Sequence, residues 1–243
     1  MNRIVFLAVG LLPLTAHADP ADGQPPATVT INALRDAEWY SYREAYKGVV
    51  ETLPLVRPRP LIRSQFQILP LHEHDTLEGI RVELVGSAVT QEIEVDAIGR
   101  FRIKLLSQPY IEDAVLRLNR AKGHFRFIGG LSIRENDSGV YSAQQLREAC
   151  EQQISAEREG GGRFRLWGKQ CVGVKFIYPL ADPVPAITFQ DAGGESRPIS
   201  AVATPPFRDS PINYRVAVYR FAQWPAHGSV MAGRALYVGA VFE

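Results

Sequence analysis

The sequence predicts a mainly β protein of the α+β class, with two helices, an antiparallel β-sandwich and a second α+β segment closed by a disulfide. Three observations support this prediction. Apolar residues alternate with polar ones through much of residues 61–134, which is the period of half-buried strands. Two other stretches, near residues 36–53 and 142–157, place apolar residues three or four positions apart, as helices do. The only two cysteines of the chain lie in its second half.

The first helix is expected to run from about Asp36 until Pro54 stops it. Its apolar positions share one face: Trp39, Tyr42, Tyr46, Val49, Val50 and Leu53. We therefore expect Trp39 in the core. The segment 57–60 reads Arg-Pro-Arg-Pro, in which each residue before a proline is restricted to extended backbone, so it predicts a stiff connector.

Six or seven short strands separated by turn residues are typical of an antiparallel β-sandwich. Among them, Ile80–Leu84 is followed by Glu92–Ile103, which contains the turn Asp96-Ala97-Ile98-Gly99-Arg100-Phe101. This combination resembles the strand-turn-strand signature of transthyretin-like or carboxypeptidase-regulatory-like modules. The resemblance covers less than a third of the chain. It implies an accessory module that supports folding or contacts a protein or glycan, without catalytic residues.

The second half is expected to begin with a helix. Ser142 and Gln145 have the pattern of a capping box for a helix that extends to about Glu157. Further strands are expected at residues 163–167, 172–178, 214–221 and 235–242. Trp167 lies in the first of these and is expected in the core. The last is apolar on both faces, which is typical of a central strand.

Cys150 and Cys171 are expected to form one structural disulfide, because an exported chain with two cysteines has one natural pairing. A zinc site would need flanking histidines, and a redox pair normally has Cys-x-x-Cys spacing. A bridge that closes a loop of this size contributes about 3 kcal/mol in the chain-entropy model. Because Cys150 lies on the apolar face of the predicted helix, the bridge would join that helix to a strand.

The first 18 residues have the pattern of a secretory signal peptide. Arg3 precedes an uncharged apolar run from Ile4 to Leu14, and Ala16-His17-Ala18 is a small-x-small cleavage pattern. The run is shorter than the roughly 20 residues that span a bilayer. We expect cleavage after Ala18 and a periplasmic or secreted mature protein. The chain as a whole resembles exported bacterial proteins.

Two domains are predicted after the leader: residues 19–135, a helix plus the β-sandwich, and residues 136–243, the α+β domain with the disulfide. The chain has 27 Lys and Arg against 26 Asp and Glu, and loss of Arg3 leaves a mature net charge of zero. This balance gives no reason to expect nucleic-acid binding. The sequence after the leader has no second long apolar run, so we expect no stable membrane insertion.

The strongest candidate for a metal site is the run His72-Glu73-His74-Asp75. In an extended segment, His72 and His74 point the same way and could share a metal, with Asp75 as a third ligand. The run lacks the His-Glu-x-x-His spacing of metalloprotease helices. The alternative interpretation is a polar loop between strands with exposed histidines. No cofactor motif is recognisable, and we expect no cofactor.

A second candidate is the run from Trp224 to Ser229, Trp-Pro-Ala-His-Gly-Ser. Trp224 and His227 on a loop suit stacking against a sugar or peptide. The alternative is that Trp224 packs back over the sheet.

These features favour a non-enzymatic exported protein of the bacterial envelope, acting through contact with an envelope protein or glycan. The alternative hypothesis is a periplasmic hydrolase, which could be metal-dependent and would use His72, His74 or His227 in a site assembled from distant parts of the chain. The sequence has no Gly-x-Ser-x-Gly elbow and, once the disulfide forms, no free cysteine, so no catalytic residue is predicted.

Overall fold

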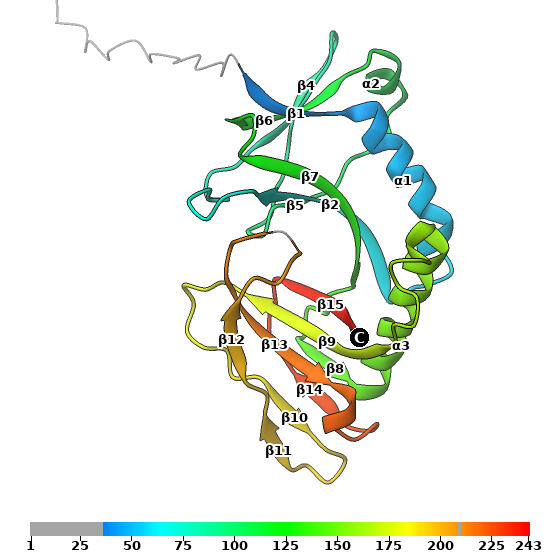
Figure 1. The fold of residues 1–243 in the computed structure, drawn as a ribbon, viewed down its shortest axis with the longest axis vertical. Helices are drawn as coiled ribbons and strands as arrows, with labels where there is room; N and C mark the ends of the chain where they lie inside the picture. Colours follow the sequence, from blue (N-terminus) through cyan, green and yellow to red (C-terminus); the bar gives the residue numbers. More distant parts are fainter. Residues whose placement is uncertain (1–35, 209) are drawn as a thin grey trace, which may run out of the picture. The chain divides into compact units, whose positions relative to one another are not determined.

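The computed structural model describes residues 36–208 and 210–243, which form antiparallel sheets with helices along one side (Figure 1). The described residues belong to the unit Leu34–Glu243. The predicted signal peptide, residues 1–18, lies outside them. The prediction of a mainly β, α+β protein with antiparallel sheets is confirmed.

The four-stranded sheet, sheet 1, holds the early strands of the described chain. Its order is β1 (Ala37–Ser41), β6 (Val115–Ala121), β3 (Val82–Val85) and β4 (Thr90–Ile93). The apolar side of β3 and β6 is buried, as the period of two predicts, through Val82, Leu84, Leu116 and Leu118. This side packs in one cluster with Phe66 and Ile68 of the neighbouring sheet.

The seven-stranded sheet, sheet 2, contains strands from both predicted domains. Its order is β12 (Ala201–Thr204), β13 (Tyr214–Arg220), β9 (Cys171–Tyr178), β15 (Tyr237–Phe242), β7 (Phe125–Ile133), β2 (Ile62–Pro70) and β5 (Arg100–Phe101). The last strand of the chain, β15, lies between β9 and β7, so the predicted central position is confirmed. The longest pairing joins β2 to β7, from Ile62↔Ile133 to Pro70↔Phe125.

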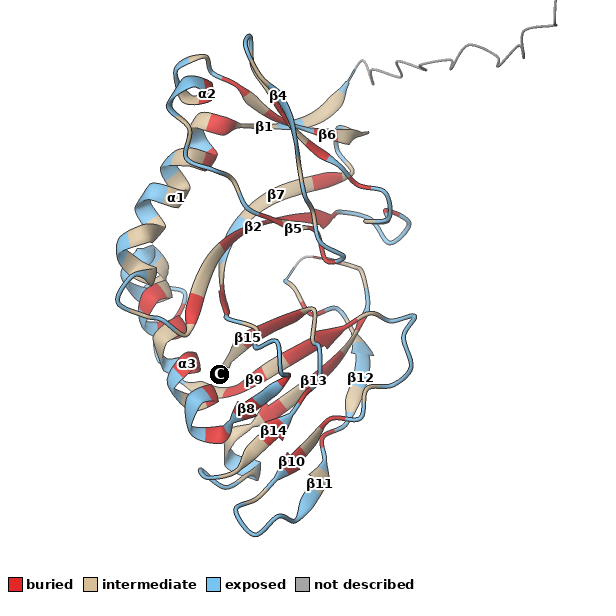
Figure 2. Cartoon of the chain, turned by 180° about the vertical axis from the view of Figure 1, so that it is seen from behind, coloured by how far each residue is buried: buried red, intermediate tan, exposed pale blue. Residues whose placement is uncertain are grey.

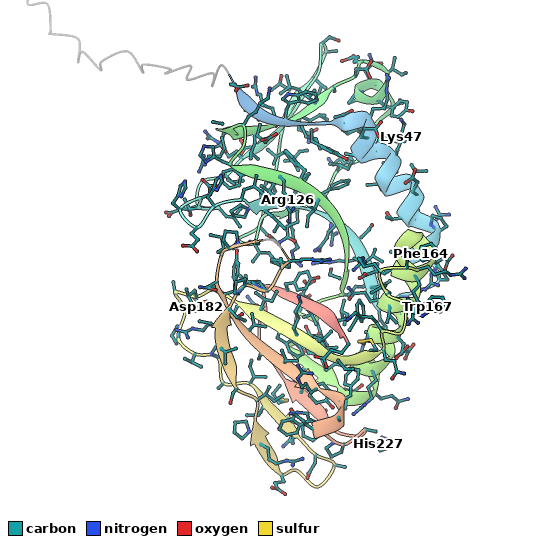
Figure 3. The ribbon with its side chains drawn as sticks, in the orientation of Figure 1. Lys47, Arg126, Phe164, Trp167, Asp182 and His227 are labelled. Carbon is teal, nitrogen blue, oxygen red and sulfur yellow. A yellow bond between two sulfur atoms is a disulfide. The ribbon has the colours of Figure 1, made fainter. Side chains whose placement is uncertain are left out.

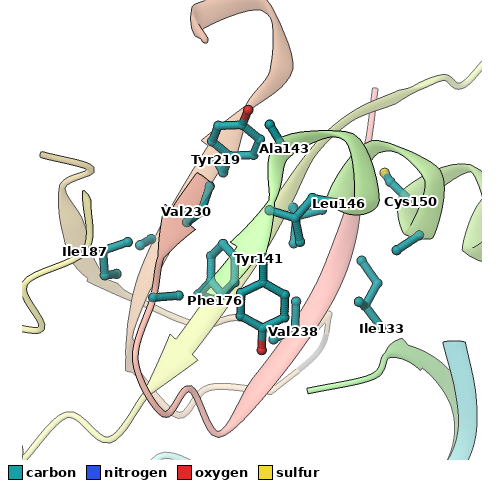
Figure 4. Close-up of a cluster of buried hydrophobic side chains, with 14 of the residues drawn as sticks. Ile133, Tyr141, Ala143, Leu146, Cys150, Phe176, Ile187, Tyr219, Val230 and Val238 are labelled. Carbon is teal, nitrogen blue, oxygen red and sulfur yellow. The ribbon is translucent and has the colours of Figure 1, made fainter. Parts of the chain in front are cut away.

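Helix α3 (Ala143–Glu157) begins as predicted, because the Ser142 hydroxyl accepts a hydrogen bond from the Gln145 amide at 3.0 Å. The π-helix η1 (Arg158–Gly162) follows it. The disulfide between Cys150 and Cys171 is present and joins α3 to β9, with the two Cα atoms 5.9 Å apart. Figure 4 shows the buried cluster beneath α3, which includes residues of β7, β9, β13 and β15.

The small four-stranded sheet, sheet 3, covers the other side of this cluster. Its order is β11 (Ser196–Pro198), β10 (Thr188–Gln190), β14 (Ser229–Met231) and β8 (Val140–Ser142). Phe189 and Val230 of this sheet are fully buried in the same cluster as Leu146 of α3.

The first predicted helix starts too early. Helix α1 runs from Tyr42 to Val56, and the residues before it form β1, which pairs with β6 through Trp39↔Arg117. The apolar spacing of residues 36–53 could not predict this strand, because β1 is formed by pairing with β6, which is distant in sequence. Trp39 is 50% exposed on this strand, so its predicted core position is wrong. Pro54 lies in the last turn of α1, two residues before its end.

Two further predictions need correction. A third, short α-helix, α2 (Ser107–Ile111), is present in addition to the two expected. Residues 163–167 form turns after η1 and no strand. Of their apolar side chains only Leu166 is buried, whereas Phe164 and Trp167 are 90% and 79% exposed, and both lie on the outside of the fold (Figure 3).

Candidate metal centre

The pairing of β2 with β7 brings two distant loops together. These strands are antiparallel, so the chain leaving β2 after Pro70 lies beside the chain entering β7 before Phe125. The amide of Leu71 donates to the carbonyl of His124 at 2.8 Å, which extends the ladder by one residue. The loop from His72 onward and the turn at Gly123 therefore meet at one end of the ribbon.

A hydrogen-bonded turn fixes the backbone of the run His72-Glu73-His74-Asp75. The Asp75 amide donates to the His72 carbonyl at 3.1 Å, and the His72 amide donates back to a carboxylate oxygen of Asp75 at 3.3 Å. Asp75 is only 8% exposed, although the residues on either side of it are exposed. A buried carboxylate is retained only when it is hydrogen-bonded or paired, and Asp75 is both.

His124 supplies the main side-chain partner of this carboxylate. Its Nδ1 lies 2.8 Å from Oδ1 of Asp75. Because a carboxylate only accepts hydrogen bonds, Nδ1 of His124 is the donor and its Nε2 faces away from Asp75. Nε2 of His72 lies 3.2 Å from the Gly123 carbonyl, which also only accepts, so this nitrogen is the donor of that ring. Each ring thus has one nitrogen fixed by the protein and one available.

His74 completes the cluster on its exposed side. Its ring stacks on that of His72, with centroids 5.4 Å apart and planes 4° from parallel. Its Nε2 lies 3.8 Å from Oδ1 of Asp75, and its side chain is 76% exposed. The ring of His124 stands edge-on to both other imidazoles.

The chemistry of this group fits a divalent transition metal. Ligand atoms of His72, Asp75 and His124 all lie within 4.8 Å of one another. Imidazole and carboxylate ligate Zn²⁺ at about 2.0–2.2 Å, so tetrahedral ligand atoms stand about 3.3 Å apart. His72 is exposed and the His124 side chain is 44% exposed, so both rings have room to turn toward an ion. The hydrogen bond from His124 to buried Asp75 matches the carboxylate–histidine pairs that orient metal ligands.

The sequence did not identify His124 as part of this group. The predicted candidates His72, His74 and Asp75 do lie together, but the third imidazole comes from a turn about 50 residues further along the chain. Only the register of β2 on β7 joins them. The signal that could have found it is the position of His124 directly before a predicted strand.

The second predicted site, Trp224 and His227, has a different arrangement. Trp224 follows the short helix η2 (Phe221–Gln223) and packs against Phe189 and Tyr219, with ring centroids 5.1 and 6.3 Å away. The guanidinium of Arg197 also lies over this ring, 4.9 Å from its centroid. The indole thus packs against side chains of β10, β11 and β13.

His227 lies apart from these aromatic contacts. Its residue is exposed, and Figure 3 shows it at the surface on the connection into β14. In the same connection, the Tyr219 hydroxyl donates to the Pro225 carbonyl at 3.3 Å. Burial raises the pKa of the Tyr219 hydroxyl, and the nearby Arg147 guanidinium opposes this rise. The loop is thus anchored by its aromatic residues, while the imidazole faces solvent.

Along residues 36–208 and 210–243, none of the helices combines the length and the apolar character that a membrane span requires. Comparison of the chain with protein-family models, with curated proteins and with solved structures finds no match. The resemblance of residues 80–103 to transthyretin-like modules stays a prediction, and the site has to be interpreted from its own geometry.

Proposed function

We propose that this protein is an exported, non-enzymatic binding protein that holds one divalent transition metal, Zn²⁺ in the first place, at the imidazoles of His72 and His124, which Asp75 orients. The buried carboxylate of Asp75 carries the proposal. It accepts hydrogen bonds from the His124 ring and from the His72 amide. It therefore holds the loop that carries His72 and orients the imidazole of His124. Burial of a carboxylate is costly unless the charge is hydrogen-bonded or paired, and here the partners of Asp75 come from the two residues with the candidate ligand rings.

The disulfide supports a location outside the cytoplasm. Structural disulfides form and persist in oxidising compartments and are rare in cytosolic proteins. The Cys150–Cys171 bridge is buried at its Cys150 end, between helix and sheet, as a structural bridge should be. The signal-peptide pattern of residues 1–18 points in the same direction. An envelope protein or glycan remains the proposed partner of the metal-loaded protein.

The geometry favours binding over hydrolysis. The hydrolase hypothesis assigned acid-base or metal roles to His72, His74 or His227, and it needed groups from distant parts of the chain to converge. His227 is instead next to Gly228, whose carbonyl accepts the amide of Ala143 at the start of α3. Asp75 is hydrogen-bonded to His124, so it acts as an orienting group for a ligand.

Zinc titration by calorimetry tests this proposal. The protein is purified without a polyhistidine tag, stripped with a chelator and titrated as wild type, His124→Ala and His227→Ala. We expect one zinc per chain for the wild type and for His227→Ala, which keeps the cluster. For His124→Ala we expect at least a hundredfold loss of affinity, because a ligand is removed. Equal affinity in all three proteins, or none in the wild type, would contradict the proposal.

A further inference from the structure

Sheet 2 divides into two parts between β7 and β15. These neighbouring strands pair at Val238↔Ile133, whereas β15 pairs with β9 over most of its length and β7 pairs with β2 along all of its own. Beyond that point the two ribbons separate, as Figure 1 shows. A cavity of about 920 Å³ lies there, bordered by α1, η1 and the end of α3.

Helix α1 borders this cavity without filling it. Of its 15 residues only Tyr42 and Ala45 are buried, and Figure 2 shows most of the helix as intermediate or exposed. Apolar residues nevertheless line the cavity from the helix, the sheet and the segment after β5: Val49, Leu55, Phe66, Phe101, Ile103 and Leu131. The lining combines these apolar side chains with charged ones of both signs, and a volume near the upper end of about 300–1,000 Å³ is within the range of small-molecule sites.

Two glycines widen the cavity at β7. Gly129 and Gly130 are adjacent residues in the middle of this strand, where glycine is unfavourable because it adds no packing. Both are exposed, although they lie in the middle of a paired strand. A Cβ atom built on Gly130 would meet no atom within 4 Å. Glycine in a strand interior often marks a place where a ligand approaches the backbone.

Lys175 of β9 brings a positive charge to the cavity wall. Its ammonium group donates to the carbonyl of Pro206 and lies 5.6 Å from the ring centroid of Phe207. Burial lowers the pKa of Lys175, and Glu157 opposes this by a longer-range attraction. Glu157 itself is engaged by Arg165 at 2.8 Å and by Gln153 at 3.0 Å. Among the described residues no carboxylate forms an ion pair with Lys175, so its charge is free to pair with an anion.

We propose that this cavity binds a long-chain carboxylate, a ligand of the fatty-acid class. The acyl chain lies between α1 and the β2–β7 ribbon, over the surface that Gly129 and Gly130 leave open. The carboxylate pairs with the ammonium group of Lys175. A ligand of this kind buries apolar surface and supplies the anion that the partly desolvated lysine lacks. The site is separate from the metal centre, because none of the metal-centre residues lines the cavity.

Displacement of a fluorescent fatty acid by palmitate tests the proposal, with hexadecanol as the uncharged comparison. The protein is first extracted to remove bound lipid and kept in chelator, so that the metal centre does not contribute. We expect Gly130→Phe to weaken palmitate and hexadecanol alike by tenfold or more, because the ring fills the cavity. We expect Lys175→Met to weaken palmitate about tenfold and to leave hexadecanol unchanged, because it removes the charge alone.

Lys169→Met is the matched control, because Lys169 is exposed and does not line the cavity. It should bind both ligands as the wild type does. Thermal unfolding shows whether each variant is folded, and the Lys175→Met result stands by itself if Gly130→Phe does not fold. Absence of palmitate binding by the wild type, or an equal loss of palmitate and hexadecanol in Lys175→Met, would overturn the proposal.

Discussion

Two candidate sites of this protein carry histidines, the metal centre beside β2 and β7 and the loop before β14, and the structure holds their histidines in opposite ways. At the metal centre, buried Asp75 of the loop after β2 fixes the backbone of His72 in the same loop and the imidazole of His124 in the turn before β7. In the loop before β14, the aromatic ring of Trp224 is fixed and the imidazole of His227 is exposed. A histidine thus becomes a candidate ligand through the groups that orient it, and not through its presence on a loop.

The largest expected effect on the free energy of unfolding distinguishes Trp224 from His227, the two candidate residues of the loop before β14. Trp224→Ala should lower the free energy of unfolding by about 3–5 kcal/mol, because it removes a ring packed against Phe189 and Tyr219. His227→Ala should change it by less than about 0.5 kcal/mol, because its side chain makes no buried contact. Urea unfolding of both variants measures the difference. Similar losses in the two would mean that the imidazole also packs.

Removal of the disulfide should have the next largest effect. The double substitution Cys150→Ala and Cys171→Ala should reduce the free energy of unfolding by about 3 kcal/mol, as the chain-entropy model gives for a separation of 21 residues. Zinc affinity should stay unchanged, because the bridge joins α3 to β9 while the metal centre depends on β2 and β7. A parallel loss of zinc binding would show that the two parts are coupled.

Asp75→Asn tests the role of the buried carboxylate in the loop that follows β2. It should lower zinc affinity about 10–100-fold, since the amide neither attracts the metal nor orients the His124 ring as a carboxylate does. Glu73→Gln is the matched control, because Glu73 is an exposed carboxylate of the same loop. Calorimetry on both variants distinguishes a specific role of Asp75 from general loss of negative charge. Equal effects of the two changes would favour the general explanation.

The smallest effect is expected at His74. Its ring is 76% exposed, and its nearest approach to Asp75 is 3.8 Å, longer than a hydrogen bond. His74→Ala should therefore weaken zinc binding by less than about tenfold, compared with at least a hundredfold for His124→Ala. The ratio of the two dissociation constants gives the measurement. A larger loss of zinc affinity for His74→Ala than for His124→Ala would mean that His74, and not His124, binds the metal directly.

The sequence predicted the elements well where local signals decide them. The capping pair Ser142 and Gln145 predicted the start of α3, and the apolar run near the C-terminus predicted the central strand β15. It failed where distant pairing overrides local pattern, as at Trp39, whose strand pairs with Arg117. The metal centre also has a part that local sequence predicts and a part that depends on distant pairing. His72, His74 and Asp75 share one short run, but His124 joins them only through the register of β2 on β7.

The most direct test of the metal centre is to follow each imidazole during zinc titration by nuclear magnetic resonance of ¹⁵N-labelled protein. We predict that the ring signals of His72 and His124 shift together and saturate at one equivalent of zinc. The signals of His227, the matched histidine of the other loop, should stay in place. Unchanged His124 signals, or shifts of all histidines that grow without saturation, would contradict the assignment of a specific site.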